Sequence, residues 1–89
     1  MTQITLEIVN EKGLHARASA KLVEVVEGFD ASAEVSKDGM NASGDSIMGL
    51  LMLAAAKGSF IDVETSGVDA DALAAALTTL VADKFGEGM

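Results

Sequence analysis

The stretch ITLEIVNEKGLHARASAKLVEVVEG, residues 4–28, decides the fold because its hydrophobic period changes along its length. Apolar and polar side chains alternate over 4–9, which is the pattern of a half-buried strand. After the break at 10–13 the period becomes helical over 16–27, and Gly28 ends the pattern. The apolar stripe of this helix is formed by Ala18, Leu22, Val25 and Val26. The stretch therefore predicts a strand followed by a helix.

Three further strands are predicted downstream. Alternation over 32–36 and again over 60–65 is typical of half-buried strands. Between them, residues 38–39 are Asp-Gly, a hairpin signal that leads into a short strand at 40–42. With the strand at 4–9, these segments predict a sheet of four short strands.

Two more helices complete the pattern. Residues 43–46, Ser-Gly-Asp-Ser, open an apolar segment at 47–56 that we interpret as a short helix. Asp69 is expected to be the N-cap of a final helix, whose apolar face is formed by Leu73, Leu77, Leu80 and Val81. The order β-α-β-β-α-β-α predicts an α+β fold, a two-layer sandwich with helices on one face of the sheet. We expect residues 1–89 to form a single domain.

Composition limits the class of protein. The absence of cysteine excludes disulfides and thiolate metal sites, and we expect no bound metal or cofactor. The longest apolar run, 47–56, is about half the length needed to cross a bilayer. The N-terminus also lacks the features of a signal peptide, so we expect a cytoplasmic location.

The net charge of −8 bears on partners. Nucleic acids and anionic membrane surfaces both require a basic surface, which this chain has too few cations to form. Small acidic proteins more often dock with larger protein partners, and complementary charge steers the encounter. We therefore expect a monomer that binds other proteins and neither nucleic acid nor membranes.

Residues 13–19, Gly-Leu-His-Ala-Arg-Ala-Ser, contain the only histidine and the only arginine of the chain. His15 falls at the predicted start of the first helix, where the free backbone N–H groups of Ala16 and Arg17 can receive phosphate oxygens. The positive end of the helix dipole opposes protonation, so a neutral, nucleophilic imidazole is expected. The side chain of Arg17 can add a charged planar fork, and Gly13 allows a sharp bend and close approach to a ligand.

Less specific interpretations of His15 compete with this one. A lone histidine at a helix start is usually a cap or an ordinary surface residue. A zinc site is disfavoured because no second histidine or cysteine is present. A serine hydrolase is disfavoured because the chain has no nucleophile elbow or oxyanion motif.

The segment 13–19 resembles the active-site segment of HPr, the histidine phosphocarrier of the bacterial phosphotransferase system. The resemblance extends over the whole chain, because length, element order and three landmarks fall where that family places them: Gly39, Ser46 and Gly58. It implies an antiparallel four-stranded sheet with three helices. It also implies that His15 accepts phosphate on Nδ1 from enzyme I and donates it to an enzyme IIA-type protein, with Arg17 stabilising the phosphate. The chain would then be a stoichiometric carrier and not an enzyme.

Residues 44–52, Gly-Asp-Ser-Ile-Met-Gly-Leu-Leu-Met, form a second candidate region. Ser46 is expected to be a helix N-cap, and its apolar neighbours could all belong to the core: Ile47, Met48, Leu51 and Met52. A short helix cannot bury every side, so we expect part of this surface, with Ile47, Met48 and Leu51, to be a docking patch beside the histidine. In relatives with an HPr kinase/phosphorylase, the matching serine is a regulatory phosphorylation site, and the resemblance extends that role to Ser46.

Two features depart from the common family pattern. Ala18 stands where the family usually has proline, which is expected to loosen the first helical turn slightly. Many sugar-transport members carry lysines around the histidine, whereas this chain has Glu24 and Glu27 on the first helix and Gly49 on the second. The string Ser-Ile-Met-Gly at 46–49 is similar to nitrogen-branch, NPr-type carriers. These features favour a regulatory phosphorelay over sugar uptake.

Two alternatives belong to other classes of protein. Asp-Ser-Ile at 45–47 resembles the Asp-Ser-Leu site of acyl carrier proteins, in which the serine, here Ser46, carries phosphopantetheine. Acyl carriers, however, are helical bundles, whereas alternating strands surround this segment. A non-catalytic binding module that uses the patch at 47–52, with His15 incidental, is the third hypothesis. The phosphocarrier is the interpretation that the sequence favours.

Overall fold

The computed structural model describes residues 1–86 and has the element order that the sequence predicts. Its strands are β1 (Thr2–Glu7), β2 (Ser32–Lys37), β3 (Met40–Ser43) and β4 (Phe60–Ser66). Its helices are α1 (Ala16–Glu27), α2 (Ile47–Met52) and α3 (Ala70–Ala82), followed by the short 3₁₀ turn η1 (Lys84–Gly86). Residues 87–89 of the predicted domain lie outside the described residues.

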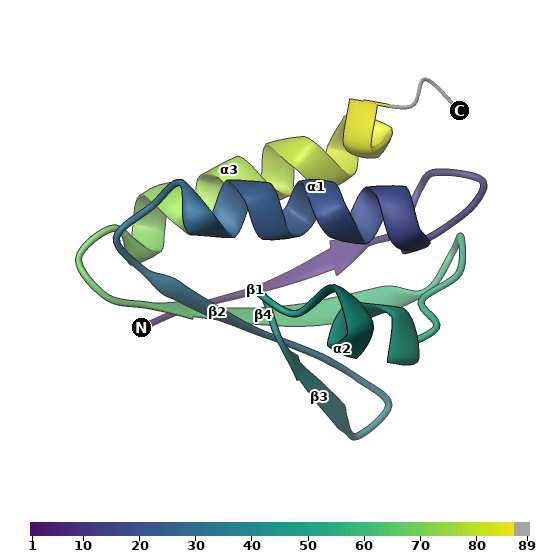
Figure 1. Ribbon diagram of the computed structural model, residues 1–89, viewed down its shortest axis with the longest axis horizontal. Helices are drawn as coiled ribbons and strands as arrows, with labels where there is room; N and C mark the ends of the chain where they lie inside the picture. The colour runs from purple at the N-terminus through teal and green to yellow at the C-terminus, as the bar shows by residue number, and fades with distance from the viewer. Residues whose placement is uncertain (87–89) are drawn as a thin grey trace.

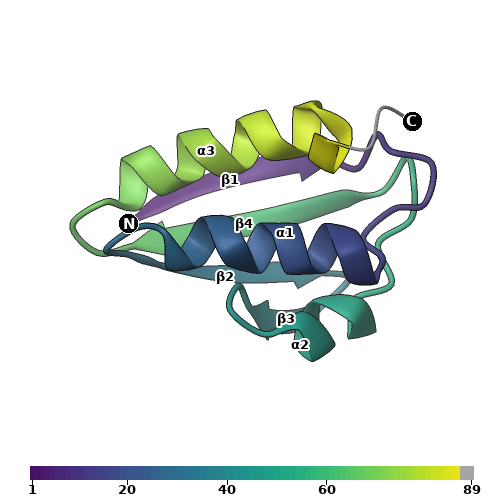
Figure 2. The same ribbon diagram turned by 45° about the horizontal axis from the view of Figure 1, so that its top comes forward.

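The four strands form one antiparallel sheet in the order β1-β4-β2-β3. The central strand β4 pairs with both β1 and β2, so that Val63 lies opposite Ile4 on one side and Val35 on the other. Helices α1 and α3 lie side by side across one face of this sheet (Figures 1 and 2), and α2 contacts α1 and β3. The predicted α+β architecture is therefore confirmed.

The β2–β3 hairpin is built as its sequence predicts. Asp38 and Gly39 both have positive φ values, 51° and 82°, which is the backbone of the primed turns that join twisted antiparallel strands. The strand register follows from this turn, because Lys37 pairs directly with Met40.

The core lies between the sheet and the two long helices. Its fully buried members are almost all aliphatic and come from every layer, including Ile8, Leu22, Val35, Ile61, Leu73 and Leu77. Each such side chain contributes roughly 1.5–3 kcal/mol relative to exposure. On α1 the buried stripe contains Val23, whereas the predicted Val25 is only partly buried. Phe85 of η1 is also fully buried, which no periodicity predicted.

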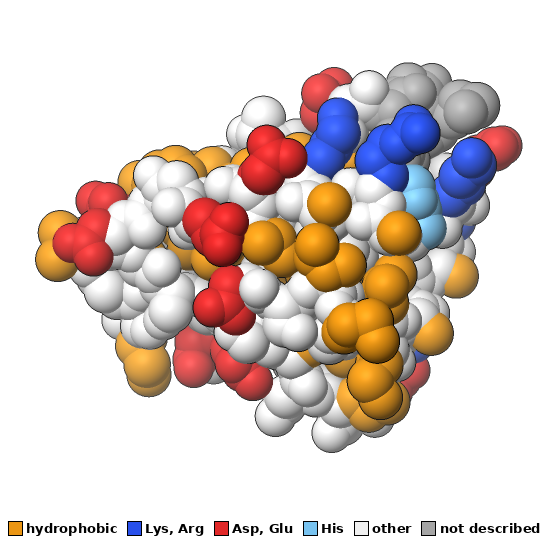
Figure 3. Space-filling view, viewed as in Figure 1, with side chains coloured by type: hydrophobic (Ala, Val, Ile, Leu, Met, Phe, Trp, Pro, Cys, Tyr) orange, Lys and Arg blue, Asp and Glu red, His pale blue; other side chains and the backbone are white. Residues whose placement is uncertain are grey.

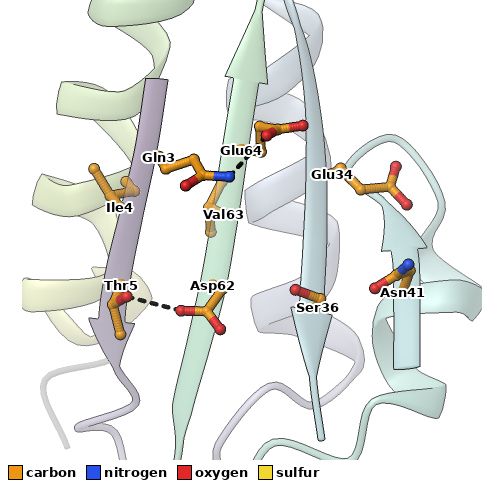
Figure 4. A pocket seen from close by; sticks show the side chains of 9 residues that line it. All are labelled: Gln3, Ile4, Thr5, Glu34, Ser36, Asn41, Asp62, Val63 and Glu64. Carbon is orange, nitrogen blue, oxygen red and sulfur yellow. Dashed lines mark hydrogen bonds between the residues drawn. The ribbon is translucent and has the colours of Figure 1, made fainter. Parts of the chain in front are cut away.

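The other face of the sheet is polar, and no helix within residues 1–86 covers it (Figure 4). Cross-strand side chains bind one another there: Gln3 Nε2 donates to Glu64 Oε2 at 2.8 Å, and Thr5 Oγ1 donates to Asp62 Oδ1 at 2.7 Å. Such pairs let the sheet face water without a second layer.

Two predicted elements have boundaries that are wrong by two residues or more, and three strands end one residue later than predicted. The first strand covers 2–7 instead of 4–9, because Thr2 and Gln3 pair with β4. Helix α2 ends at Met52 instead of continuing to 56, since Ala54 takes a left-handed conformation with a φ of 52°.

Asp69 is the N-cap residue of α3, as predicted, and its carbonyl accepts from Leu73 N at 2.8 Å, but its side chain does not cap the helix. No side-chain cap bond is formed, and its Oδ2 instead accepts from the backbone N–H of Asp30 at 2.9 Å. The carboxylate therefore ties the start of α3 to the segment that follows α1. None of the helices within residues 1–86 is long and apolar enough to span a membrane.

Candidate functional site at the start of α1

His15 is the N-cap residue of α1. Its backbone is extended, with φ −81° and ψ −174°, and the helix begins at the next residue. Its carbonyl accepts the first intrahelical bond, from Ser19 N at 2.8 Å. The imidazole Nδ1 accepts a long hydrogen bond of 3.3 Å from the backbone N–H of Arg17. The partly exposed ring therefore lies against the first turn, at the end of the helix that favours anions.

This hydrogen bond distinguishes the two ring nitrogens of His15. An N–H can donate only to a nitrogen that presents a lone pair, so Nδ1 is the acceptor. In the neutral ring, the proton is then on Nε2. The nitrogen that faces the helix start is thus the one able to act as a nucleophile.

The loop before His15 is pressed against the loop after α2. Gly13 has a φ of 66°, and a Cβ placed on it would lie 2.4 Å from the carbonyl oxygen of Ala55. The adjacent Leu14 N donates to that same oxygen at 2.8 Å. The bend predicted at Gly13 is present, but the close approach that it permits is to the protein's own backbone, not to a ligand.

Arg17 and Ala16 are both exposed in the first turn of α1. The amide of Arg17, predicted to bind phosphate, is engaged with the ring of His15. The side chains of Arg17 and His15 come from positions two residues apart at the same end of the helix.

The second candidate residue, Ser46, directly precedes helix α2. Ser46 is its N-cap, and Oγ accepts from Gly49 N at 3.0 Å. The interpretation of its apolar residues as core is wrong for most of them, because the buried residue of this helix is Leu50. Ile47, Met48 and Met52 are 41%, 70% and 67% exposed, and Leu51 is half-buried. We call these four residues the α2 patch.

The α2 patch and the histidine lie on the same side of the molecule. Helix α2 contacts α1, and Figure 3 shows hydrophobic side chains extending down from beside the histidine. Contiguous exposed groups of apolar side chains often mark interaction surfaces, whereas apolar side chains scattered singly over a surface do not.

Basic and acidic side chains occupy different parts of this same side. Figure 3 shows lysine and arginine side chains gathered near the histidine, with acidic side chains farther along α1. Glu24 and Glu27 lie about 10 and 15 Å beyond Arg17 along the helix axis, at 1.5 Å per residue. The acidic residues noted in the sequence therefore do not surround the ring.

Two residues of the site were not singled out from the sequence. Asn10 and Ser19 are both fully buried, and their side chains donate to the loop carbonyls of Gly13 and Leu14. The available signal was an asparagine directly after a strand, a residue that readily closes local turns with its side chain.

Solved structures with this fold identify the class of protein. The chain superposes on HPr-C-His from Thermoanaerobacter tengcongensis with a TM-score of 0.94 and 35% identity, covering 100% of both chains. It superposes on the phosphocarrier protein HPr from Bacillus anthracis with a TM-score of 0.85 and 35% identity, covering 90% and 95%. The fold is that of the histidine phosphocarriers.

The sequence places the chain within one family of that class. The family model "PTS HPr component phosphorylation site" matches residues 2–83. The chain is 47% identical to phosphocarrier protein HPr of Neisseria meningitidis over 99% of each, and 42% identical to phosphocarrier protein NPr of Escherichia coli over 93% of each. The chain belongs to the PTS HPr family. The acyl carrier alternative is wrong, because its helical bundle has no counterpart of this sheet.

Proposed function

We propose that this chain accepts a phosphoryl group on Nδ1 of His15 from phosphorylated enzyme I and donates it to an enzyme IIA-type protein. Membership of the HPr family supports a role as a phosphocarrier of the phosphotransferase system. The observation that carries the finer proposal is the bond from Arg17 N to Nδ1, because it directs one lone pair of the ring toward a helix N-terminus. The protein is a carrier whose phosphohistidine is consumed once per transfer.

The chemical step is an in-line displacement between two imidazoles. Nδ1 of His15 forms a bond to phosphorus while the phosphorus–nitrogen bond of the donor histidine breaks, and the electron pair of that bond returns to the donor ring. Nε2 of His15 keeps its proton during the attack. The reverse displacement, with the ring of His15 as leaving group, passes the phosphoryl group to the acceptor.

The first turn of α1 stabilises the transferred group. When Nδ1 binds phosphorus, the N–H of Arg17 loses its ring acceptor and donates to a phosphoryl oxygen at the same place. The amide of Ala16 and the guanidinium of Arg17 supply further donors to the developing charge. These groups belong to one helix turn, so little reorganisation accompanies the transfer.

The α2 patch is the docking surface in this proposal. Ile47, Met48 and Leu51 bury apolar area against a partner, while the basic residues beside His15 attract an acidic rim around the partner's active site. Phosphorylation of Ser46 by an HPr kinase/phosphorylase places a phosphate at the edge of this patch. The added charge opposes the burial of the patch and so weakens docking.

The test uses the purified chain, enzyme I and phosphoenolpyruvate. We expect intact mass to rise by one phosphoryl group, and the phosphate to be labile in acid and stable in base, as a phosphoramidate is. His15→Ala is expected to remain unlabelled, and Ser46→Ala to be labelled like the unmodified chain. Equal labelling of His15→Ala would show that another residue accepts the group.

The same assay distinguishes the regulatory nitrogen branch of the phosphotransferase system from the sugar-uptake branch. Relatives named HPr and NPr both match the chain over more than 90% of their length. The Ser-Ile-Met-Gly string and the acidic half of α1 favour the regulatory branch. We therefore expect faster labelling by the nitrogen-branch enzyme I than by the sugar-branch enzyme I. The opposite order of rates would assign the chain to sugar uptake.

A further inference from the structure

The backbone that leads into His15 is held at three consecutive carbonyls, those of residues 13–15. The carbonyl of Gly13 accepts from Asn10 Nδ2 at 2.8 Å, and that of Leu14 accepts from Ser19 Oγ at 3.3 Å. The carbonyl of His15 accepts from Ser19 N at 2.8 Å. Three consecutive carbonyls therefore have defined donors, and two of these donors are buried side chains.

The amides of the same segment are also engaged. Gly13 N donates to the carbonyl of Asn10 at 3.2 Å, and Leu14 N donates to the carbonyl of Ala55 at 2.8 Å. Asn10 thus closes the turn from both sides, with its carbonyl and with its side-chain amide. The segment is fixed to the first part of the β1–α1 loop through Asn10, to α1 through Ser19 and to the loop after α2 through Ala55.

We propose that Asn10 and Ser19 are positioning residues, whose buried side-chain donors fix the backbone before His15 and thereby hold its Nδ1 against the first-turn amide. The bonds that carry this proposal run from the two side chains to the carbonyls of Gly13 and Leu14. This inference deepens the proposed phosphocarrier function and rests on it for its kinetic consequence.

The burial of Asn10 and Ser19 indicates that their polar side chains are present for the hydrogen bonds they make and not for contact with solvent. Asn10 and Ser19 are both 0% exposed, and a buried polar group is costly unless it is hydrogen-bonded. An apolar side chain in either place would avoid that cost but would provide no donor. The two donors fix the conformation of the backbone that orients the imidazole of His15.

Ser19 also bears on the first turn of α1. Ala18 was expected to leave this turn looser than proline would. The hydroxyl of Ser19 crosses the same turn and holds the carbonyl of Leu14, the residue before the N-cap. In this chain a side-chain bond supplies part of the rigidity that a proline ring would supply.

The experiment compares Ser19→Ala and Asn10→Ala with Val23→Ala in the full chain. Ser19→Ala removes only the hydroxyl and retains helix propensity, so it should fold even if Asn10→Ala does not. Val23 is buried on the same helix and makes no hydrogen bond to the loop through its side chain, so its truncation lowers stability without touching the positioning bonds.

Two readouts separate positioning from general stability. In transfer from enzyme I, we expect kcat to fall between about tenfold and a hundredfold for Asn10→Ala, and less for Ser19→Ala, with KM within twofold. In nitrogen-15 NMR at a pH where the ring is neutral, both variants should shift the Nδ1 and Nε2 resonances toward a mixture of tautomers. Val23→Ala should change neither readout.

The outcomes are distinct. Unchanged kcat in Ser19→Ala and in folded Asn10→Ala would overturn the proposal, even if the ring resonances moved. An equal fall in Val23→Ala would also overturn it by showing that stability alone is responsible. If the unmodified chain accepts no phosphate on His15, the proposed function fails. The NMR comparison would then still test whether the two side chains orient the ring.

Discussion

The first turns of α1 and α2 begin with the same capping geometry and differ in what surrounds it. In both, an extended residue presents a side-chain acceptor to a backbone N–H of the first turn: His15 Nδ1 to Arg17 N, and Ser46 Oγ to Gly49 N. At α1 the cap is an imidazole ring, and lysine and arginine side chains lie near it (Figure 3). At α2 the cap is a hydroxyl, and exposed apolar side chains follow it.

The difference shows how one local structure supports two kinds of interaction. A helix N-terminus favours an anion in either place. At α1 the chain adds a group that can form a bond to phosphorus, and at α2 it adds area that can be buried against a protein. Our hypothesis therefore assigns the chemistry to the start of α1 and the docking to α2, and the predictions below test that assignment.

The largest effect is expected from removing the two caps in turn. His15→Ala should abolish phosphate acceptance, whereas Ser46→Ala should leave its rate within twofold. Each variant should lose about 1 kcal/mol of stability, because each loses one N-cap bond. Phosphate incorporation and urea unfolding measure these quantities. Loss of acceptance in both variants would end the division between the helix starts.

Arg17→Ala is expected to have the next largest effect, because it removes a cation beside the ring but leaves the nucleophile. Transfer should slow by about 10- to 100-fold while the final extent of labelling is retained. Arg17→Lys should be intermediate, since it keeps the charge without the planar fork. Rapid-quench measurement of single transfers provides the rate. An unchanged rate in Arg17→Ala would remove this side chain from the mechanism.

Ser46→Asp is expected to act on docking alone. Aspartate is also a good N-cap, so stability should remain within about 0.5 kcal/mol of the unmodified chain. The new charge lies at the edge of the α2 patch and must be desolvated on docking, so KM for enzyme I should rise about tenfold with little change in kcat. Steady-state kinetics tests this. A fall in kcat with constant KM would contradict it.

The smallest effect is expected at the start of α3, where the side chain of the N-cap residue Asp69 makes no cap bond. Asp69→Ala should cost roughly 0.5–1.5 kcal/mol, because it removes the acceptor of Asp30 N. Hydrogen exchange should show lost protection at Asp30 and unchanged protection in the first turn of α3. Loss of protection at α3 instead would mean that Asp69 caps the helix in solution. Phosphate transfer should not change.

Sequence periodicity was sufficient where one face of an element is buried. It predicted all seven helices and strands of the sandwich and the full extent of α1, because alternation and helical spacing follow directly from which side faces the core. It also located His15 at a helix start, since the strand pattern ends before it and the helical pattern begins after it.

The errors arose where distant segments decide local structure. Residues 53–56 look helical, yet α2 ends at Met52, and the carbonyl of Ala55 binds Leu14 of the β1–α1 loop. No glycine or proline marks that ending. Asn10 resembled an ordinary loop residue in the sequence, yet its side chain is fully buried. Phe85 is buried by a left-handed turn with a φ of 55°, which has no periodic signature.

The shared position of His15 and the α2 patch on one side of the molecule limits how the protein can work (Figure 3). In the proposed function the donor and the acceptor both dock on this side, so they cannot occupy it together and the donor departs before the acceptor binds. The rate of phosphoryl transfer through the carrier is then governed by how quickly each complex dissociates. A patch of four side chains is suited to short-lived complexes. A larger interface would slow dissociation and so reduce the number of transfers per second.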